Sequence, residues 1–209
     1  MSLPRGSGRR TTALRSALRR RERIRRDRRA AFDERVLAAL ARPRAIVYTD
    51  TADFTRRAAR DGILHFMMVF DRAVRALRKA ASRHRGRIVK VEADSLLLSF
   101  PDAERACRGV AAMDRSLRQV NRGRPADERL RFSYGVGCGD VIDLEEDLFG
   151  LEVNLASKLG EDLARPGEAL LTPSAAEALT PALRWRLAPR GVVNYGGRPM
   201  AVRLLRLGR

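Results

Sequence analysis

Residues that build covalent or soft-metal sites are scarce in this chain. Its 209 residues include two cysteines, Cys107 and Cys138, and two histidines, His65 and His84. Two thiols do not indicate a disulfide framework or a zinc site, and two imidazoles are too few for a histidine-based metal centre. A hard cation held by carboxylates is the metal chemistry that this composition leaves open. The shortage of cysteine also favours a reducing cytoplasm as the location.

Long hydrophobic runs are also missing. No run of 18 or more apolar residues occurs, so we predict no membrane-spanning helix. The N-terminal segment has no apolar stretch followed by a small-residue cleavage site, so we expect no secretory signal. Hydrophobic residues still make up 44% of the chain, which argues against disorder and allows one domain with a core.

Lysine is rare, whereas arginine is abundant. Only Lys79, Lys90 and Lys158 are lysines among 43 basic residues, and the net charge is +18. Residues 1–44 hold 15 Arg against four acids, so most of the excess charge lies in an N-terminal arm. Such an arm could touch an acidic membrane surface, pair across a dimer, or be a solvated helix in an arginine-rich protein. Nucleic acid is the partner that we least expect, because the arm has almost no aromatic residues for base stacking.

This basic arm is expected to be helical. Residues 1–11 are rich in Gly, Ser and Arg, so we expect them to be disordered. From Thr12 to about Ala41 the chain has good helix formers and no Gly or Pro, which predicts one helix that ends before Pro43. We therefore divide the chain into the basic arm, residues 1–43, and a compact domain, residues 44–209.

Strand and helix patterns alternate along the compact domain. The predicted strands are 45–48, 87–91, 96–100, 131–142, 169–171, 192–195 and 201–205, and the predicted helices are 61–85, 102–120 and 151–163. This order predicts an α+β domain, an α/β sandwich in which helices flank one mixed central sheet.

Two carboxylates follow predicted strands. Asp50 comes directly after an apolar strand, and Asp94 lies in the turn between two others. Two such groups brought close together do not both stay ionised cheaply without a cation between them. Mg²⁺ needs few carboxylates, because phosphate oxygens and waters complete its octahedron. By itself this pattern is weak, since Asp commonly caps turns and helices.

Four sequence motifs support a metal site at Asp50 and Asp94, because they resemble motifs of a known enzyme family. Tyr48-Thr-Asp-Thr-Ala-Asp-Phe-Thr55 resembles the first metal motif of class III adenylate and guanylate cyclases, F-A-D-I-x-G-F-T. Lys90-Val-Glu-Ala-Asp-Ser-Leu-Leu-Leu-Ser-Phe100 resembles their K-x-x-G-D-x-x-M-x-x-F motif. Gly135-Val-Gly-Cys-Gly-Asp-Val141 is similar to G-I-H-T-G-E-V, and Asp147-Leu-Phe-Gly150 with Val153-Asn-Leu-Ala-Ser-Lys-Leu159 to D-x-W/F-G-x-x-V-N-L-A-S-R-L. Four motifs in this order, across about residues 44–206, are far more specific than any one of them.

The resemblance implies a ferredoxin-like class III cyclase domain and a reaction. Asp50 and Asp94, assisted by the Thr51 carbonyl, would hold two Mg²⁺ or Mn²⁺ ions. These ions would bridge a nucleoside triphosphate and activate its 3′-hydroxyl, giving a cyclic nucleotide and pyrophosphate. The site would lie at a homodimer interface, with the metal residues from one protomer and the other site residues from its partner.

The remaining site residues are implied in the same way. Lys90 and Asp147 match the pair that reads adenine, so ATP is favoured over GTP, although alone each would be a solvated Lys or a turn Asp. Asn154 matches the residue that positions the ribose, and Lys158 stands where the family has a catalytic Arg. Arg198 lies where the family often has a triphosphate-binding Lys, and an exposed loop Arg is the equal alternative.

Several positions depart from the family pattern. Lys158 keeps the charge of the usual Arg but loses its planar five-donor fork, which predicts a slow enzyme. Asp53 and Ala93 each replace a usual Gly, and Glu92 replaces an apolar residue. These changes fit either a divergent cyclase with low activity or a non-catalytic, nucleotide-binding regulatory module.

Overall fold

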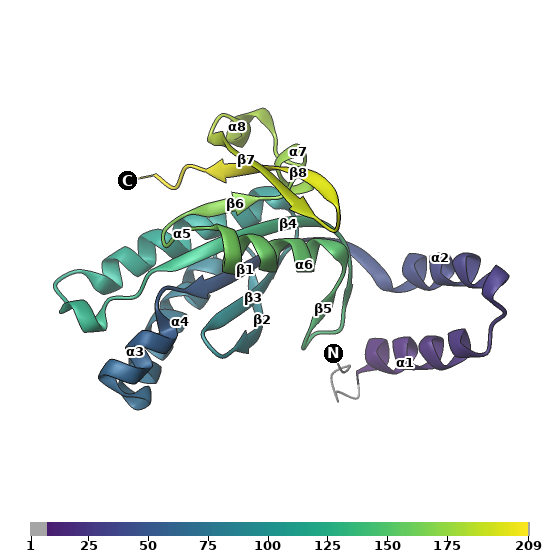
Figure 1. The fold of residues 1–209 in the computed structure, drawn as a ribbon, viewed down its shortest axis with the longest axis horizontal. Helices are drawn as coiled ribbons and strands as arrows, with labels where there is room; N and C mark the ends of the chain where they lie inside the picture. Colours follow the sequence, from purple (N-terminus) through teal and green to yellow (C-terminus); the bar gives the residue numbers. More distant parts are fainter. Residues whose placement is uncertain (1–7, 209) are drawn as a thin grey trace.

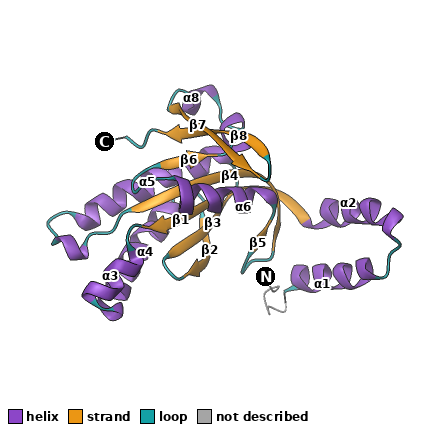
Figure 2. Ribbon diagram, in the orientation of Figure 1, coloured by secondary structure: helices purple, strands orange, loops and turns teal. Residues whose placement is uncertain are grey.

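The structure is a computed structural model that describes residues 8–208. Its β-strands form a single mixed sheet in the order β2-β3-β1-β4-β6-β8-β7, with β5 paired to β4 (Figures 1 and 2). All neighbouring strands are antiparallel except β4 and β6, which are parallel. The strands are β1 (Ala41–Thr51), β2 (Arg87–Glu92), β3 (Ser95–Phe100), β4 (Phe132–Asp143), β5 (Leu148–Phe149), β6 (Ala169–Leu171), β7 (Leu187–Tyr195) and β8 (Arg198–Leu205). The predicted α+β class with a mixed, helix-flanked sheet is therefore confirmed.

Helices cover both faces of the sheet. The α-helices are α1 (Arg9–Glu22), α2 (Arg29–Leu40), α3 (Phe54–Asp61), α4 (Ile63–Ser82), α5 (Ala103–Asn121), α6 (Leu151–Lys158), α7 (Pro173–Glu177) and α8 (Pro181–Arg184). Two 3₁₀ turns, Arg26–Arg28 and Ala126–Glu128, and a π-helical turn, Leu159–Leu163, complete the elements. Within the described residues, no helix is long and apolar enough to cross a membrane.

The core divides between the two faces because side chains alternate along the central strand. Ala45 and Val47 of β1 belong to the main apolar cluster, which includes the buried side of α4 and α5. Ile46, between them, points to the other face and packs in a second cluster with Val153 and Ala156 of α6. Thus α6 lies on one face of β1, and α4 and α5 lie on the other.

The N-terminal arm differs from its prediction. Instead of one helix from Thr12 to Ala41, α1 and α2 form a helical hairpin that projects from the sheet (Figure 1). The reversal falls within the segment 19–29, whose eight Arg residues repel one another and bury little apolar surface. Arg21 closes the hairpin through two hydrogen bonds to Asp33, at 2.6 and 2.9 Å. Residues 9–11, expected to be disordered, belong to α1, whereas residues 1–7 lie outside the described part.

The first strand is longer than expected. β1 begins at Ala41 rather than Ala45, directly after α2, and it contains Pro43. Pro43 pairs with Asp140 of β4, and β3 pairs with β1 only from Ala45 onward. Pro43 thus lies where β1 has one neighbour, a position at which a strand tolerates proline. Helix α3 was not predicted, and the predicted helix 61–85 is α4.

Candidate active site

The metal-ligand candidates come together where β1 ends and the β2–β3 turn begins. Asp50 is the second-last residue of β1, and Asp94 lies in the two-residue turn between β2 and β3. The Thr51 hydroxyl donates a hydrogen bond to the Asp94 carboxylate, and the Ser95 hydroxyl donates one to Oδ1 of Asp50 at 3.1 Å. The three predicted residues therefore form one polar cluster on rigid strand ends.

Within this cluster, the negative charge of Asp94 affects the ionisation of Asp50. Burial, and then the negative charge of Asp94, raise the pKa of Asp50 to about 6. Within residues 8–208, no group of three or more His, Cys, Asp or Glu side chains forms a candidate metal centre. Two carboxylates still suit Mg²⁺ or Mn²⁺, which also take oxygen ligands from phosphates and water. Asp50 and Asp94 thus fit a cation that arrives with a phosphate ligand.

Both glycine replacements near this cluster have left-handed backbones. Asp53 has φ of 65° and Ala93 has φ of 51°. Glycine adopts this region freely, whereas a side chain there costs roughly 1 to 2 kcal/mol, less for Asp and Asn. The chain therefore keeps the backbone shape of a glycine turn on both sides of the candidate metal site, without the glycine.

The predicted base-reading residues share a cavity of about 350 Å³. Lys90 of β2, Asp147 just before β5 and Asn154 of α6 all line it. Lys90 Nζ lies 3.5 Å from Asp147 Oδ2, and the backbone N–H of Leu148 donates to Asp147 Oδ1 at 2.9 Å. These contacts place a donor and an acceptor side by side at the wall of one cavity.

Glu92 competes for the same lysine. Its carboxylate lies 3.1 Å from Lys90 Nζ. The hydrogen bond to Glu92 is the main cause that raises the pKa of Lys90, ahead of the charge of Asp147. Lys90 thus has two carboxylate partners, Glu92 and Asp147.

Two residues that the sequence argument missed connect the cavity to the carboxylates. Ser95, which donates to Asp50, also lines the cavity, as does Tyr48 of β1. Burial, and then the nearby Glu161, raise the pKa of Tyr48 above its usual value. Tyr48 is two residues before Asp50 on the same strand face, which is the signal that could have identified it.

Close backbone packing explains the glycine-rich strand motif. A Cβ atom on Gly135 of β4 would lie 1.9 Å from the carbonyl oxygen of Ala156 in α6. A Cβ on Gly137 would lie 2.5 Å from the carbonyl oxygen of Glu152. These glycines let α6, which carries Asn154 and Lys158, lie directly on the sheet.

Two predicted residues lie outside this cavity. Lys158 Nζ forms an ion pair with Asp162 at 2.5 Å, and its side chain is 43% exposed. Arg198 is exposed at the start of β8, directly after the Gly196-Gly197 turn. Neither lines the cavity that holds Lys90, Asp147 and Asn154.

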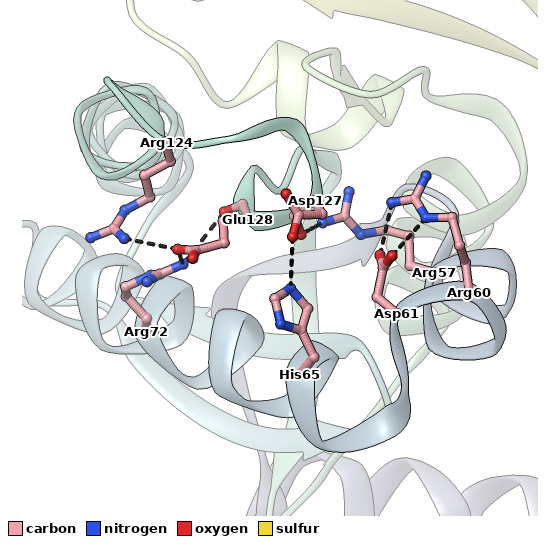
Figure 3. Close-up of polar contacts among 8 residues, drawn as sticks. All are labelled: Arg57, Arg60, Asp61, His65, Arg72, Arg124, Asp127 and Glu128. Carbon is pink, nitrogen blue, oxygen red and sulfur yellow. Dashed lines mark hydrogen bonds and ion pairs between the residues drawn. The ribbon is translucent and has the colours of Figure 1, made fainter.

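A polar network fixes the segment that follows the metal candidates (Figure 3). Arg57 of α3 donates to the carbonyl oxygen of Asp127, and His65 of α4 lies 3.5 Å from the Asp127 carboxylate. Glu128 accepts from Arg72 at 2.8 Å and from Arg124 at 2.9 Å (Figure 3). The turn Ala126–Glu128 thereby holds α3 and α4, and α3 begins four residues after Asp50.

Comparisons with known proteins agree with this architecture. No protein-family model matches the chain. A putative adenylate cyclase 3 from Rhizobium meliloti is 32% identical over 123 residues, which are 59% of this chain and 21% of that protein.

Solved structures give matches of similar kind. The adenylate/guanylate cyclase/hydrolase from Silicibacter pomeroyi is 24% identical, with a TM-score of 0.67 over 79% of this chain and 96% of that one. The catalytic core of a rhodopsin-guanylyl cyclase with converted specificity, in complex with ATPαS, is 18% identical, with a TM-score of 0.69 over 79% and 98% of the two chains. With its sheet order, its paired carboxylates and its cavity, the chain has the fold of the class III adenylate and guanylate cyclase catalytic domains.

Proposed function

We propose that this cyclase-like domain converts ATP to 3′,5′-cyclic AMP and pyrophosphate. The observation that carries the proposal is the continuity of two sites: Ser95 lines the cavity of Lys90, Asp147 and Asn154 and also hydrogen-bonds Asp50. The chain therefore holds both halves of a nucleotide site, a cavity for the base and a carboxylate pair suited to a triphosphate-bound cation, and a twofold dimer would face each half with the other half of its partner. GTP is the alternative substrate, because guanylate cyclases share the fold.

The residues divide the work between base and phosphates. Lys90 Nζ donates to a ring nitrogen of adenine, and Asp147 accepts from the exocyclic amine. Asn154 orients the ribose, and Asp50 and Asp94 with the Thr51 carbonyl hold two Mg²⁺ or Mn²⁺ ions. When bound, such ions lower the pKa of the attacking hydroxyl and neutralise the leaving charge. The 3′-hydroxyl gives its proton to water and its oxygen bonds to the α-phosphorus, while the bond from that phosphorus to the oxygen of the leaving pyrophosphate breaks.

Lys158 and Arg198 are assigned to the phosphates in this proposal. Lys158 would leave Asp162 to stabilise charge on the α-phosphate, and Arg198 would reach the triphosphate from the β7–β8 turn. An ammonium gives a point charge rather than a fork, and the ion pair with Asp162 must first be broken. We therefore expect a slow enzyme, with a loss of about 30- to 1000-fold against an Arg at this position.

A homodimer would complete the site. Ile63, Leu64, Met67 and Met68 of α4 are between 50% and 79% exposed, and α4 and β2 line an apolar cavity of about 460 Å³ together with Phe54 and Ala93. Ala93 is the neighbour of Asp94, so this apolar surface lies beside the metal candidates. Apolar surface of this kind is typical of interfaces between subunits.

A product assay tests the proposal. Purified protein is incubated with ATP, GTP, CTP or UTP, each with Mg²⁺ or Mn²⁺, and products are identified by mass spectrometry. We expect cyclic AMP from ATP and none from the Asp50→Ala variant. Changing Lys90 to Glu together with Asp147 to Cys should shift preference toward GTP. Unchanged ATP preference in that variant would contradict the roles given to Lys90 and Asp147.

The second candidate is a regulatory module that binds nucleotide without turnover. The ion pair of Lys158 and the strained turn at Ala93 favour it. Nucleotide binding by calorimetry, with no cyclic product under any condition from a folded dimer, would support this candidate. Recovery of activity in Lys158→Arg would then identify the position that was lost.

For the basic arm, we propose peripheral contact with the acidic cytoplasmic face of a membrane. Arg23, Arg25, Arg26 and Arg28 are exposed at the hairpin tip, with Ile24 among them. Each cation near an anionic surface contributes about 1 kcal/mol. Changing these four Arg to Gln should abolish co-sedimentation with phosphatidylserine vesicles, and equal loss after removing four Arg from the sheet domain would overturn the assignment.

A further inference from the structure

A second polar cavity lies away from the candidate active site. Its volume is about 550 Å³, and it is formed where α4 ends and α5 begins. Its lining residues are Arg83, His84, Arg85, Asp102, Glu104, Arg105 and Arg108. Since α4 and α5 lie on the sheet face opposite α6, this cavity is separate from the one that holds Lys90, Asp147 and Asn154.

The two acids of this cavity are already engaged. Asp102 caps α5 by accepting from the backbone N–H of Arg105 at 2.8 Å, and it also pairs with the Arg105 guanidinium. Glu104 accepts from the backbone N–H of Thr180 at 3.2 Å and lies 3.7 Å from Arg108. Neither acid is therefore left to neutralise the remaining cations.

Arg83 and Arg85 are those remaining cations. Both are exposed, and within residues 8–208 neither forms an ion pair with an acid. The potential around them is positive: after burial, the charges of Arg108, Arg115 and Arg83 lower the pKa of His84. The N-terminal end of α5, with its positive partial charge, lies at the same cavity.

Arg85, one of these two cations, has a strained backbone conformation. Arg85 has φ of 60°, in the position after a helix where glycine is the usual residue. The chain reversal is closed by the backbone N–H of Gly86, which donates to Ala81 at 3.0 Å. A side chain at such a position is strained where glycine would not be, and this strain points to a use for the side chain.

We propose that this cavity binds an oligophosphate anion, separately from the nucleotide cavity. Guanidinium forks bond phosphate oxygens in pairs, and two unneutralised forks on one turn match adjacent phosphates of a chain. The ligand is either a free oligophosphate or the phosphate chain of a nucleotide. The inference does not depend on cyclase activity.

Isothermal titration calorimetry with tripolyphosphate, in EDTA and at fixed low ionic strength, tests this site. The test variant is Arg83→Ala with Arg85→Ala, and the matched control is Arg122→Ala with Arg206→Ala, which removes the same charge from exposed positions. A third variant, Lys158→Ala with Arg198→Ala, removes the two cations assigned to the phosphates in the candidate active site. Thermal unfolding confirms that each variant is folded.

We expect about tenfold weaker binding in the test variant, because it loses two exposed charge contacts, and unchanged binding in the other two. Equal losses in the test and control variants would show a general charge effect and overturn the proposal. Loss of binding confined to the variant of Lys158 and Arg198, or no binding by any protein, would also overturn it. Titration with ATP distinguishes the sources: affinity equal to that for tripolyphosphate indicates recognition of the phosphate chain alone.

Discussion

At the residue scale, Asp50 makes the metal-free domain sensitive to pH. The pKa of Asp50 is about 6 in the folded domain and about 3.9 in the unfolded chain. Asp50 therefore makes its full contribution to the free energy of unfolding below pH 4, and this contribution is lost as pH rises through 6. Asp50→Asn keeps the acceptor for Ser95 and removes this loss. We expect the variant to be more stable than the parent by about 1 kcal/mol at pH 8, after allowance for solvent screening, and equally stable near pH 4.

Urea denaturation in EDTA at pH 4, 6 and 8 measures this difference. Added Mg²⁺ should then stabilise the parent chain and leave Asp50→Asn unaffected. A stability difference that is the same at all three pH values would contradict the assigned pKa.

Ala93 gives a second prediction at this scale. Its left-handed backbone is strained by its Cβ atom, so Ala93→Gly should stabilise the fold by about 0.5 to 1 kcal/mol, the relief of strain less the entropy cost of glycine. Ala112→Gly, within helix α5, is the matched control and should destabilise by about 1 kcal/mol. Chemical denaturation compares the two, and a loss of stability in Ala93→Gly would show that the turn is unstrained.

At the element scale, the contact between α6 and β4 depends on missing side chains. Gly135→Ala would place a Cβ atom against the Ala156 carbonyl, so α6 must move away from the sheet. We expect a loss of about 3 kcal/mol in the free energy of unfolding. Gly208→Ala, where a Cβ meets nothing, should be neutral. Similar small effects for both variants in thermal unfolding would mean that α6 shifts at little cost.

Elements with a clear apolar pattern were predictable from sequence, and elements without one were not. The hairpin turn Ala93–Asp94, the strand 169–171 and the helix 102–120 follow clear apolar patterns and were found to within a residue or so. The break in the arm was missed because residues 19–29, taken one at a time, are compatible with a helix. The repulsion among their arginine side chains appears only when the whole segment is considered. Helix α3 was missed because it buries no residue, and so leaves no apolar stripe.

The site was predictable where chemistry and motif order coincided. Asp50, Thr51 and Asp94 form one cluster, and Lys90, Asp147 and Asn154 line one cavity, as their motifs suggested. Ser95 gave no signal of its own, because a serine on a buried strand is typical of the core, and the only signal for Tyr48 was its place two residues before Asp50 on the same strand face. The ion pair of Lys158 with Asp162 could not be predicted from the motif either, because it depends on a side-chain rotamer rather than on residue type.

At the scale of the whole molecule, a site shared between protomers predicts complementation. Asp50→Ala and Asn154→Ala should each abolish cyclase activity as homodimers. If the metal residues of one protomer serve the ribose residue of its partner, random mixing gives half heterodimers, each with one intact site of two. Activity should then recover to about a quarter of the parent value.

Activity after mixing, with heterodimer content measured by native mass spectrometry, checks this prediction. Leu64→Asp is the companion variant, because Leu64 is 79% exposed on α4 and so should affect association more than folding. Heterodimers that form without activity would place each site within one protomer.

The direct junction between α2 and β1 has a mechanical consequence. No linker separates the hairpin from the central strand, since α2 ends at Leu40 and β1 starts at Ala41. Asp50 and Thr51 follow Ala41 by nine and ten residues on the same strand, about 30 Å away along its length. Since β4 pairs with β1 from Ala41 to Thr51 and β3 pairs with it from Ala45 to Thr49, the hairpin and Asp50 lie at opposite ends of one paired strand. A force on the hairpin therefore acts on the same strand that sets the position of Asp50 relative to Asp94.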